Sequence, residues 1–333
     1  MIDWVTAKMP CRNTLNTGFV AKVEPCGRIE WVSQSWLPVQ GSYDNNIVIK
    51  PMTDNTIQIS GNPTKWLQGH NLFGTNDLKW LMAKFYLDLH EKLCDDGLNP
   101  TGEQYDMVEQ GNYTVSRVDV NETWHLNNQA EVMAWIRSAG EKVALKRRGR
   151  GVFAGDTLYY GKNSRRWSLK MYSKGHELQK RKLSKDLDIP ELQDFADKAL
   201  RIELTLRSLE LKERGLHFAQ RWTPDFAIML LMEAVGKLEM SNNFSLNDDK
   251  LALLKPRLRL AYKAWLRGDD LRQDLPKMTY YRYRKELLEF GIDISNVQDV
   301  DKPLDNVVPL VRVLEALPAS IPDWAYEKKL VVC

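Results

Sequence analysis

The chain has 333 residues and a formal net charge of +3; 43% of its residues are hydrophobic and 27% are charged, which is typical of a globular protein with one large domain or two of ordinary size. We expect no membrane partner, because the sequence contains neither an apolar run long enough to cross a bilayer nor a secretory signal pattern. Its four cysteines, at 11, 26, 94 and 333, are widely spaced without a CxxC motif, which argues against a zinc site or a disulfide framework and favours a reducing cytoplasm.

The N-terminal part of the chain reads as strands interspersed with short helices. Residues 47–49 and 56–60 are rich in β-branched side chains and predict strands, and Gly61-Asn62-Pro63 predicts a turn. A helix is expected over residues 77–93, with Asp77 as its N-cap. Its apolar positions recur at helical spacing, at Leu78, Leu81, Phe85, Leu89 and Leu93. Residues 131–138 predict another helix.

The character of the sequence changes after about residue 220, where long helical patterns replace strands. We therefore expect an α+β domain over residues 1–220 and a mostly helical domain over residues 221–333. In the second domain, a helix over 257–267, a short segment over 269–275 and a helix over 279–290 have the spacing of a helix-turn-helix. Arg282 and Lys285 lie opposite the broad apolar side of the last helix and are free to contact DNA; the alternative is a bundle in which its tyrosines only pack.

Basic residues are concentrated between positions 141 and 185, where only Glu141, Asp156 and Glu177 oppose them. The cluster comprises Lys142, Lys146, Arg147, Arg148, Arg150, Lys162, Arg165, Arg166, Lys170, Lys174, Lys180, Arg181, Lys182 and Lys185. Such a cluster attracts polyanions, since binding releases their counterions. A solvated charged surface would give the same pattern, and only its position beside a candidate site favours nucleic acid.

Three segments predict strands that place polar side chains on one face, because alternate residues of a strand point to the same side. The shared polar positions are Ser168, Lys170, Tyr172 and Lys174 in the first, Arg201, Glu203, Thr205 and Arg207 in the second, and Arg117, Asp119 and Asn121 in the third. If the strands are neighbours in an antiparallel sheet, Asp119, Tyr172 and Glu203 converge. Two carboxylates suit Mg²⁺ or Mn²⁺, and Lys170, Lys174 and the metal would favour the phenolate of Tyr172 as a nucleophile. A solvent-facing sheet surface has the same alternation.

Four segments in order along the chain resemble the gene II replication proteins of filamentous phages. They are residues 65–78, 116–119, 169–179 and 200–203. The last two, with residues 155–161 before them, also resemble plasmid initiators of rolling-circle replication. The resemblance covers about residues 1–220, with a looser helical similarity to about residue 295.

This resemblance implies the replication-initiator (HUH-like) nuclease fold, a central antiparallel sheet flanked by helices. Tyr172 matches the family nucleophile, which would nick the viral strand at the phage origin, form a 5′-phosphotyrosine and later rejoin the strand. The free 3′-hydroxyl would prime a host DNA polymerase. The family further implies a host helicase, a host single-strand binding protein and the host bacterial cytoplasm. The alternatives are a non-catalytic DNA-binding regulator and a plasmid-type initiator.

The metal site departs from the wider class, in which a His–hydrophobic–His motif often holds the cation. Asp119-Val120-Asn121 has that spacing with different side chains. Asp119 and Glu203 are therefore the first candidates for metal ligands and His70 is the third, although the loop around His70 could equally contact DNA phosphates. We expect Arg117, Arg165 and Arg166 to contact DNA, together with Arg282 and Lys285.

Overall fold

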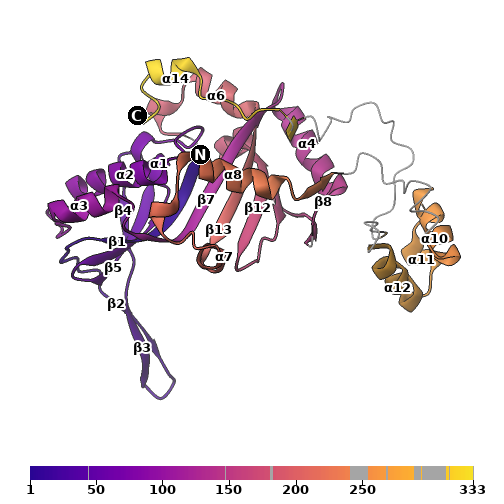
Figure 1. Cartoon of the computed structure of the whole chain (residues 1–333), viewed down its shortest axis with the longest axis horizontal. Coiled ribbons are helices and arrows are strands. Elements are labelled where there is room, and N and C mark those ends of the chain that lie inside the picture. Colours follow the sequence, from indigo (N-terminus) through magenta and orange to yellow (C-terminus); the bar gives the residue numbers. More distant parts are fainter. Residues whose placement is uncertain are drawn as a thin grey trace. The chain divides into compact units, whose positions relative to one another are not determined.

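A computed structural model describes residues 1–43, 45–146, 148–180, 183–240, 254–267, 269–288, 294, 313–314 and 316–332 (Figure 1). The chain forms two compact units, one of residues 1–240 with 309–333 and the other of residues 241–308. No helix in the described ranges is long and apolar enough to cross a membrane.

The first unit is built on a nine-stranded sheet in which every neighbouring pair is antiparallel, so the predicted α+β class with a central antiparallel sheet is confirmed. The strand order is β10-β11-β12-β13-β7-β1-β6-β5-β4. In chain order the strands are β1 (Ile2–Pro10), β4 (Leu37–Gln40), β5 (Asn46–Thr53), β6 (Thr56–Gly61), β7 (Thr114–His125), β10 (Val152–Ala154), β11 (Thr157–Tyr160), β12 (Trp167–Ser173) and β13 (Ala199–Arg207).

Helices bury the apolar positions of these strands. The helices of the first unit are α1 (Pro63–Gln68), α2 (Leu78–Leu93), α3 (Gly102–Glu109), α4 (Gln129–Lys142), α5 (Lys174–Lys180), α6 (Pro190–Asp197), α7 (Ser208–Glu213), α8 (Pro224–Val235) and α14 (Asp323–Glu327). Helix α4 contacts β11, β12 and β13, and the Tyr160 hydroxyl donates to the Ala139 and Val143 carbonyls. Helix α8 contacts β7 and β13. Removing these apolar side chains from water stabilises the sheet and leaves the alternate, polar positions for the site.

Local signals in the sequence determine where α1 and α2 begin and where α1 ends. Asp77 caps α2 as predicted, because its carboxylate accepts from the Trp80 amide. The predicted turn at 61–63 instead begins α1: the Asn62 side chain caps it and Pro63 is its first residue. Helix α1 ends at Gly69, whose φ of +80° is left-handed and whose missing Cβ leaves room for Leu187 and Tyr43. This ending directs residues 70–72 toward the site.

A two-stranded ribbon, β2 (Phe19–Val23) and β3 (Ile29–Gln34), forms a sheet of its own and extends away from the main sheet (Figure 1). Apolar side chains on it are exposed, among them Phe19, Ile29 and Trp31. A further small sheet joins β14 (Leu238–Met240), β8 (Val143–Leu145) and β9 (Gly149–Arg150). Neither sheet was predicted from the sequence.

The second unit contains α10 (Pro256–Leu266), α11 (Leu271–Asp274) and α12 (Lys277–Leu288). Their shared core includes Tyr262, Trp265, Tyr280 and Leu287. Arg282 and Lys285 are exposed on α12 as expected. The helix begins before Thr279, and the predicted end at residues 290 and 291 lies outside the described residues.

The first unit extends past residue 220. Helix α8 belongs to it, and so do residues 316–332, which return to the sheet: the Ala319 amide donates to the Thr123 carbonyl, and the Trp124 indole donates to the Ala316 carbonyl. A functional boundary near residue 220 stays a prediction.

Candidate active site on the polar face of the sheet

The register of β12, β13 and β7 brings the three predicted polar faces together. Lys170 pairs with Glu203, which pairs with Asn121 on its other side. The next rows along the strands are Tyr172 with Arg201, and Thr205 with Asp119. Because these positions alternate with buried apolar residues, they share one face. The predicted adjacency of the three strands is confirmed.

Two buried carboxylates lie at the centre of this face, each held by a basic side chain. The Arg117 guanidinium donates from Nε to Asp119 Oδ1 at 2.8 Å and from Nη2 to Oδ2 at 2.5 Å. The Lys170 ammonium lies 2.7 Å from Glu203 Oε1. Burial raises the pKa of Glu203 to about 7, with Lys170 opposing the rise and Asp119 adding to it. The two acidic groups therefore lie buried together on this face, each beside a basic side chain.

Tyr172 lies beside this pair, with only 6% of the residue exposed. Its hydroxyl donates to Glu203 Oε2 at 3.3 Å, and the Lys170 ammonium lies 5.1 Å from its ring centroid. Burial raises the pKa of Tyr172 well above its usual value, and Glu177 and Glu203 raise it further while Arg201 lowers it. The phenol is therefore protonated at neutral pH, so its reaction as a nucleophile requires a proton acceptor.

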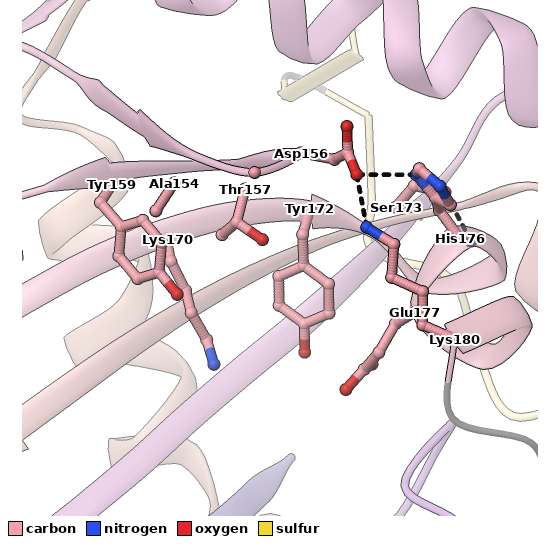
Figure 2. Close-up of a pocket in the computed structure, with 11 residues that line it drawn as sticks. Ala154, Asp156, Thr157, Tyr159, Lys170, Tyr172, Ser173, His176, Glu177 and Lys180 are labelled. Atoms are coloured by element: carbon pink, nitrogen blue, oxygen red, sulfur yellow. Dashed lines mark hydrogen bonds and ion pairs between the residues drawn. The ribbon is translucent and has the colours of Figure 1, made fainter.

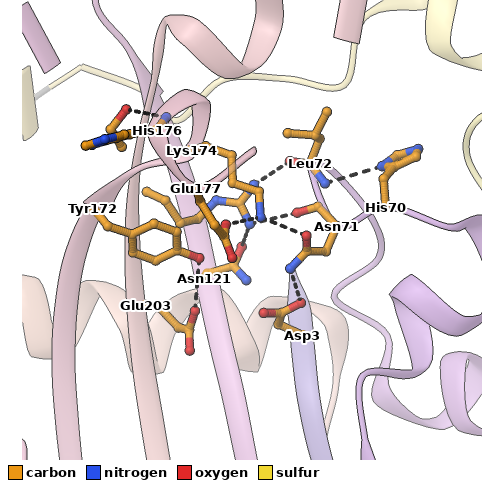
Figure 3. Close-up of polar contacts among 12 residues, drawn as sticks. Asp3, His70, Asn71, Leu72, Asn121, Tyr172, Lys174, His176, Glu177 and Glu203 are labelled. Atoms are coloured by element: carbon orange, nitrogen blue, oxygen red, sulfur yellow. Dashed lines mark hydrogen bonds and ion pairs between the residues drawn. The ribbon is translucent and has the colours of Figure 1, made fainter. Parts of the chain in front are cut away.

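Lys174 is buried and engaged by neutral and acidic partners. Its ammonium donates to Glu177 Oε2 at 2.6 Å and to Asn71 Oδ1 at 2.7 Å (Figure 3). Burial lowers its pKa, and Glu177 opposes that effect. Because Lys170 and Lys174 are each paired with a carboxylate, much of the positive field expected of them at Tyr172 is offset.

Arg201 is the residue whose importance sequence reasoning missed. It is fully buried, and its guanidinium donates to three neutral oxygens: the Asn71 carbonyl at 3.0 Å, the Leu72 carbonyl at 2.5 Å and Asn121 Oδ1 at 2.8 Å. Its Nε has no hydrogen-bond partner among the residues that the structure describes. An arginine directly opposite Tyr172 keeps its charge close to the phenol. The signal available in the sequence was its place on the same strand face as Glu203.

The structure does not bring His70 to Asp119 and Glu203. Its Nδ1 accepts from the Leu72 amide at 3.3 Å, and its Nε2 lies 2.9 Å from the Leu330 carbonyl, so His70 is held on the far side of Asn71 from Glu203 (Figure 3). Burial lowers its pKa to about 4, with the Leu330 carbonyl opposing the shift. Both ring nitrogens therefore serve the packing of residues 70–72 against the C-terminal segment.

Two of the expected DNA contacts, Arg165 and Arg166, lie away from the nucleophile within the first unit. Arg165 and Arg166 are exposed just before β12, at the opposite end of that strand from Tyr172. Arg166 forms ion pairs with Glu210, at 3.4 Å, and with Glu213. These arginines therefore do not reach the reacting group.

A pocket of about 280 Å³ opens beside Tyr172 (Figure 2). Its lining includes Thr157, Lys170, His176 and Glu177. Asp156 at its rim pairs with Lys180 at 2.6 Å and with His176 at 3.4 Å. Tyr172 lies between Lys170 and Glu177 in this view, so a substrate in the pocket would meet the tyrosine and two groups able to carry charge.

The carboxylate pair fits a hard divalent cation. Mg²⁺ is usually held by one or two carboxylates, together with water and substrate phosphates. Asp119 and Glu203 supply two, and a cation would compensate their burial and their mutual repulsion, the two effects that raise the pKa of Glu203. Over the described ranges no group of three or more His, Cys, Asp or Glu side chains is placed to hold a metal.

The fold and site define an α+β protein with a buried tyrosine and a carboxylate pair on the polar face of an antiparallel sheet. Residues 1–225 match the N-terminal model of the gene II family of replication-associated proteins, and residues 248–331 match the C-terminal model of the same family. The replication-associated protein of this family from Enterobacteria phage I2-2 is 41% identical over 97% of this chain and 96% of its own length. That of Enterobacteria phage M13 is 23% identical over 83% and 78%. The chain belongs to this family of phage replication proteins, which confirms the predicted gene II family.

A solved structure of a rolling circle replication initiator protein from Geobacillus stearothermophilus aligns with a TM-score of 0.34 and 12% identity. The alignment covers 79% of this chain and 94% of that one. This similarity is too low to support any argument about the site.

Proposed function

We propose that the protein initiates rolling-circle replication by nicking the viral strand of a phage origin through Tyr172 and later rejoining that strand. The observation that carries the proposal is the Tyr172 hydroxyl, which is hydrogen-bonded to Glu203 beside an open polar pocket. Membership of a replication-associated family supplies the biological setting. A tyrosine hydroxyl can act as the nucleophile of covalent catalysis once it has lost its proton.

In the nicking step, Tyr172 Oη bonds to the scissile phosphorus while the bond from phosphorus to the 3′-oxygen breaks. The phenolic proton passes to water, and the departing 3′-oxygen takes up a proton from water. The reverse step rejoins the strand, since the phosphotyrosine conserves the energy of the phosphodiester.

Asp119 and Glu203 are the residues that would hold Mg²⁺ or Mn²⁺, which would polarise the scissile phosphate and offset its developing charge. The second unit would bind duplex origin DNA through Arg282 and Lys285, which are exposed on α12. The released 3′-hydroxyl would be extended by a host DNA polymerase, with a host helicase and single-strand binding protein, in the bacterial cytoplasm.

Tyr172→Phe tests the nucleophile. We expect it to abolish nicking and adduct formation while binding to DNA persists, because it removes the attacking oxygen and keeps the ring. The assay is incubation of supercoiled phage DNA with Mg²⁺, scored for open circles and for protein linked to 5′ ends.

Tyr159→Phe is the matched control, since Tyr159 lines the same pocket from β11. Its variant should nick like the wild type. Adducts formed by Tyr172→Phe at the wild-type rate would reject the assignment, and undiminished nicking in excess EDTA would reject the metal. DNA binding without any adduct in the wild type would favour a non-catalytic regulator.

A further inference from the structure

We propose that Arg117 and Lys170 take the place of the divalent cation over Asp119 and Glu203 in the free protein, and that DNA phosphate draws them away, so that DNA and the cation bind cooperatively. This inference rests on the proposed function, because it concerns the order in which the same site is filled. It assigns to these two residues a positioning role in addition to contact with DNA.

The two basic side chains cover the carboxylates from the solvent side. The Asp119 and Glu203 side chains are 2% and 1% exposed, whereas their partners Arg117 and Lys170 are 40% and 27% exposed. A cation arriving from solvent therefore meets the guanidinium and the ammonium first. Two buried like charges need such compensation, because burying an unpaired carboxylate costs several kcal/mol.

The oxygens that a metal would use are already occupied. Both Asp119 oxygens accept from Arg117, and the two Glu203 oxygens contact Lys170 and Tyr172 respectively. Mg²⁺ binds carboxylate oxygen directly at about 2.0–2.1 Å. A dication at that distance would lie against both basic groups, and like-charge repulsion would displace them. In the free protein, metal binding thus has to break two ion pairs.

A second arginine on the same face would help Arg117 to bind a phosphate. Arg207 lies directly opposite Arg117 in the register, and burial together with Arg117 lowers the pKa of Arg207. Two neighbouring guanidinium groups are stabilised by an anion between them, and arginine forms strong paired hydrogen bonds with phosphate. Arg117 also lies over the Trp4 ring at 5.1 Å, and Lys170 over the Tyr172 ring at 5.1 Å, so each has a second contact on this face besides its carboxylate.

A backbone phosphate would therefore release the carboxylates as it binds Arg117 and Lys170. By thermodynamic linkage the effect is reciprocal: DNA raises the affinity for the cation by the same factor by which the cation raises the affinity for DNA. The metal would be bound tightly only when a strand is in place, which would limit cleavage to the assembled complex.

The test measures Mn²⁺ binding to the full chain by calorimetry, with and without a single-stranded oligonucleotide of the phage origin strand. Every protein carries Tyr172→Phe so that no cleavage occurs. In the reference protein we expect the oligonucleotide to raise Mn²⁺ affinity about tenfold, within the range of ordinary coupling. Adding Arg117→Gln with Lys170→Met should raise Mn²⁺ affinity in the absence of DNA by about tenfold. The factor by which the oligonucleotide raises Mn²⁺ affinity should then fall toward one.

Arg214→Gln is the matched control, because Arg214 also pairs with a carboxylate, that of Glu233 at 2.7 Å, but has no place in the candidate site. It should leave both quantities unchanged. A second variant, Arg117→Lys, keeps the charge but loses the paired hydrogen bonds, and should give intermediate values even if the double variant folds poorly.

The outcomes separate the two proposals. Mn²⁺ affinity that is unchanged or lower in the double variant and in Arg117→Lys overturns the exchange while leaving the metal site standing. Absence of Mn²⁺ binding to every protein, with and without DNA, overturns the metal site and the exchange with it. If the oligonucleotide still raises Mn²⁺ affinity in the double variant, the cooperativity comes from a phosphate that binds the metal directly. That result also rejects the replacement of the cation by Arg117 and Lys170.

Discussion

Replacing Arg201 should separate its structural contribution from its effect on Tyr172. Arg201→Met removes the charge and three hydrogen bonds to buried oxygens, those of Asn71, Leu72 and Asn121. Hydrogen bonds from a charged donor each contribute about 1.5–3 kcal/mol, but bonds within one network are not additive. We expect a loss of about 3–5 kcal/mol in the free energy of unfolding, and a melting temperature lower by about 10 °C at roughly 2–4 °C per kcal/mol.

The charge also acts on the reaction, with a definite sign. Arg201 lowers the pKa of Tyr172, in opposition to burial, Glu177 and Glu203. Removing the charge raises that pKa further, so less phenolate forms at any pH and the rate of nicking should keep rising to a higher pH than in the wild type. At a pH below this pKa, the phenolate fraction falls about tenfold for each unit by which the pKa rises, and the nicking rate falls with it. Arg201→Lys retains a charge, so its pH profile should stay close to the wild type although its stability falls.

The assay is a pH–rate profile of single-turnover nicking at a temperature where each variant is folded, beside thermal melts of the same proteins. A lower melting temperature with an unchanged pH profile in Arg201→Met would mean that Arg201 only supports residues 70–72. Equal alkaline shifts in the Met and Lys variants would show that hydrogen bonding, rather than charge, is responsible.

Two further predictions concern His70 and the second unit. The pKa of His70 is about 4 in the folded protein and about 6.5 in an unfolded chain, so the unfolded state binds more protons between these values and the free energy of unfolding should fall as pH drops from about 6.5 to about 4. Glu203 changes the free energy of unfolding with the opposite sign over an overlapping pH range. The check is therefore urea unfolding of His70→Gln beside the wild type across this range. Equal pH slopes of the free energy of unfolding would contradict the assignment. Arg282→Ala with Lys285→Ala should weaken duplex-origin binding and flatten its salt dependence while cleavage of a single-stranded origin persists, and an unchanged salt slope would show that α12 only packs.

The sequence by itself determined the polar face of the sheet. Side chains alternate along a strand whatever the strand later pairs with, so Asp119, Tyr172 and Glu203 could each be assigned to a face from a few neighbouring residues. The N-cap at Asp77 and the exposure of Arg282 follow from local sequence in the same way. The ordered motifs around these residues also identified the family.

Only the tertiary structure decided which groups neutralise one another. That Lys170 pairs with Glu203 depends on the register between β12 and β13, which are separate in the chain, whereas Arg117 and Asp119 are two residues apart on β7. The burial of Arg201 needs the carbonyls of residues 71 and 72, and His70 turns to Leu330, which lies 260 residues away. Periodicity specifies the side of an element on which a side chain lies, but long-range packing selects its partner, and in a buried site the partner sets charge, pKa and reactivity.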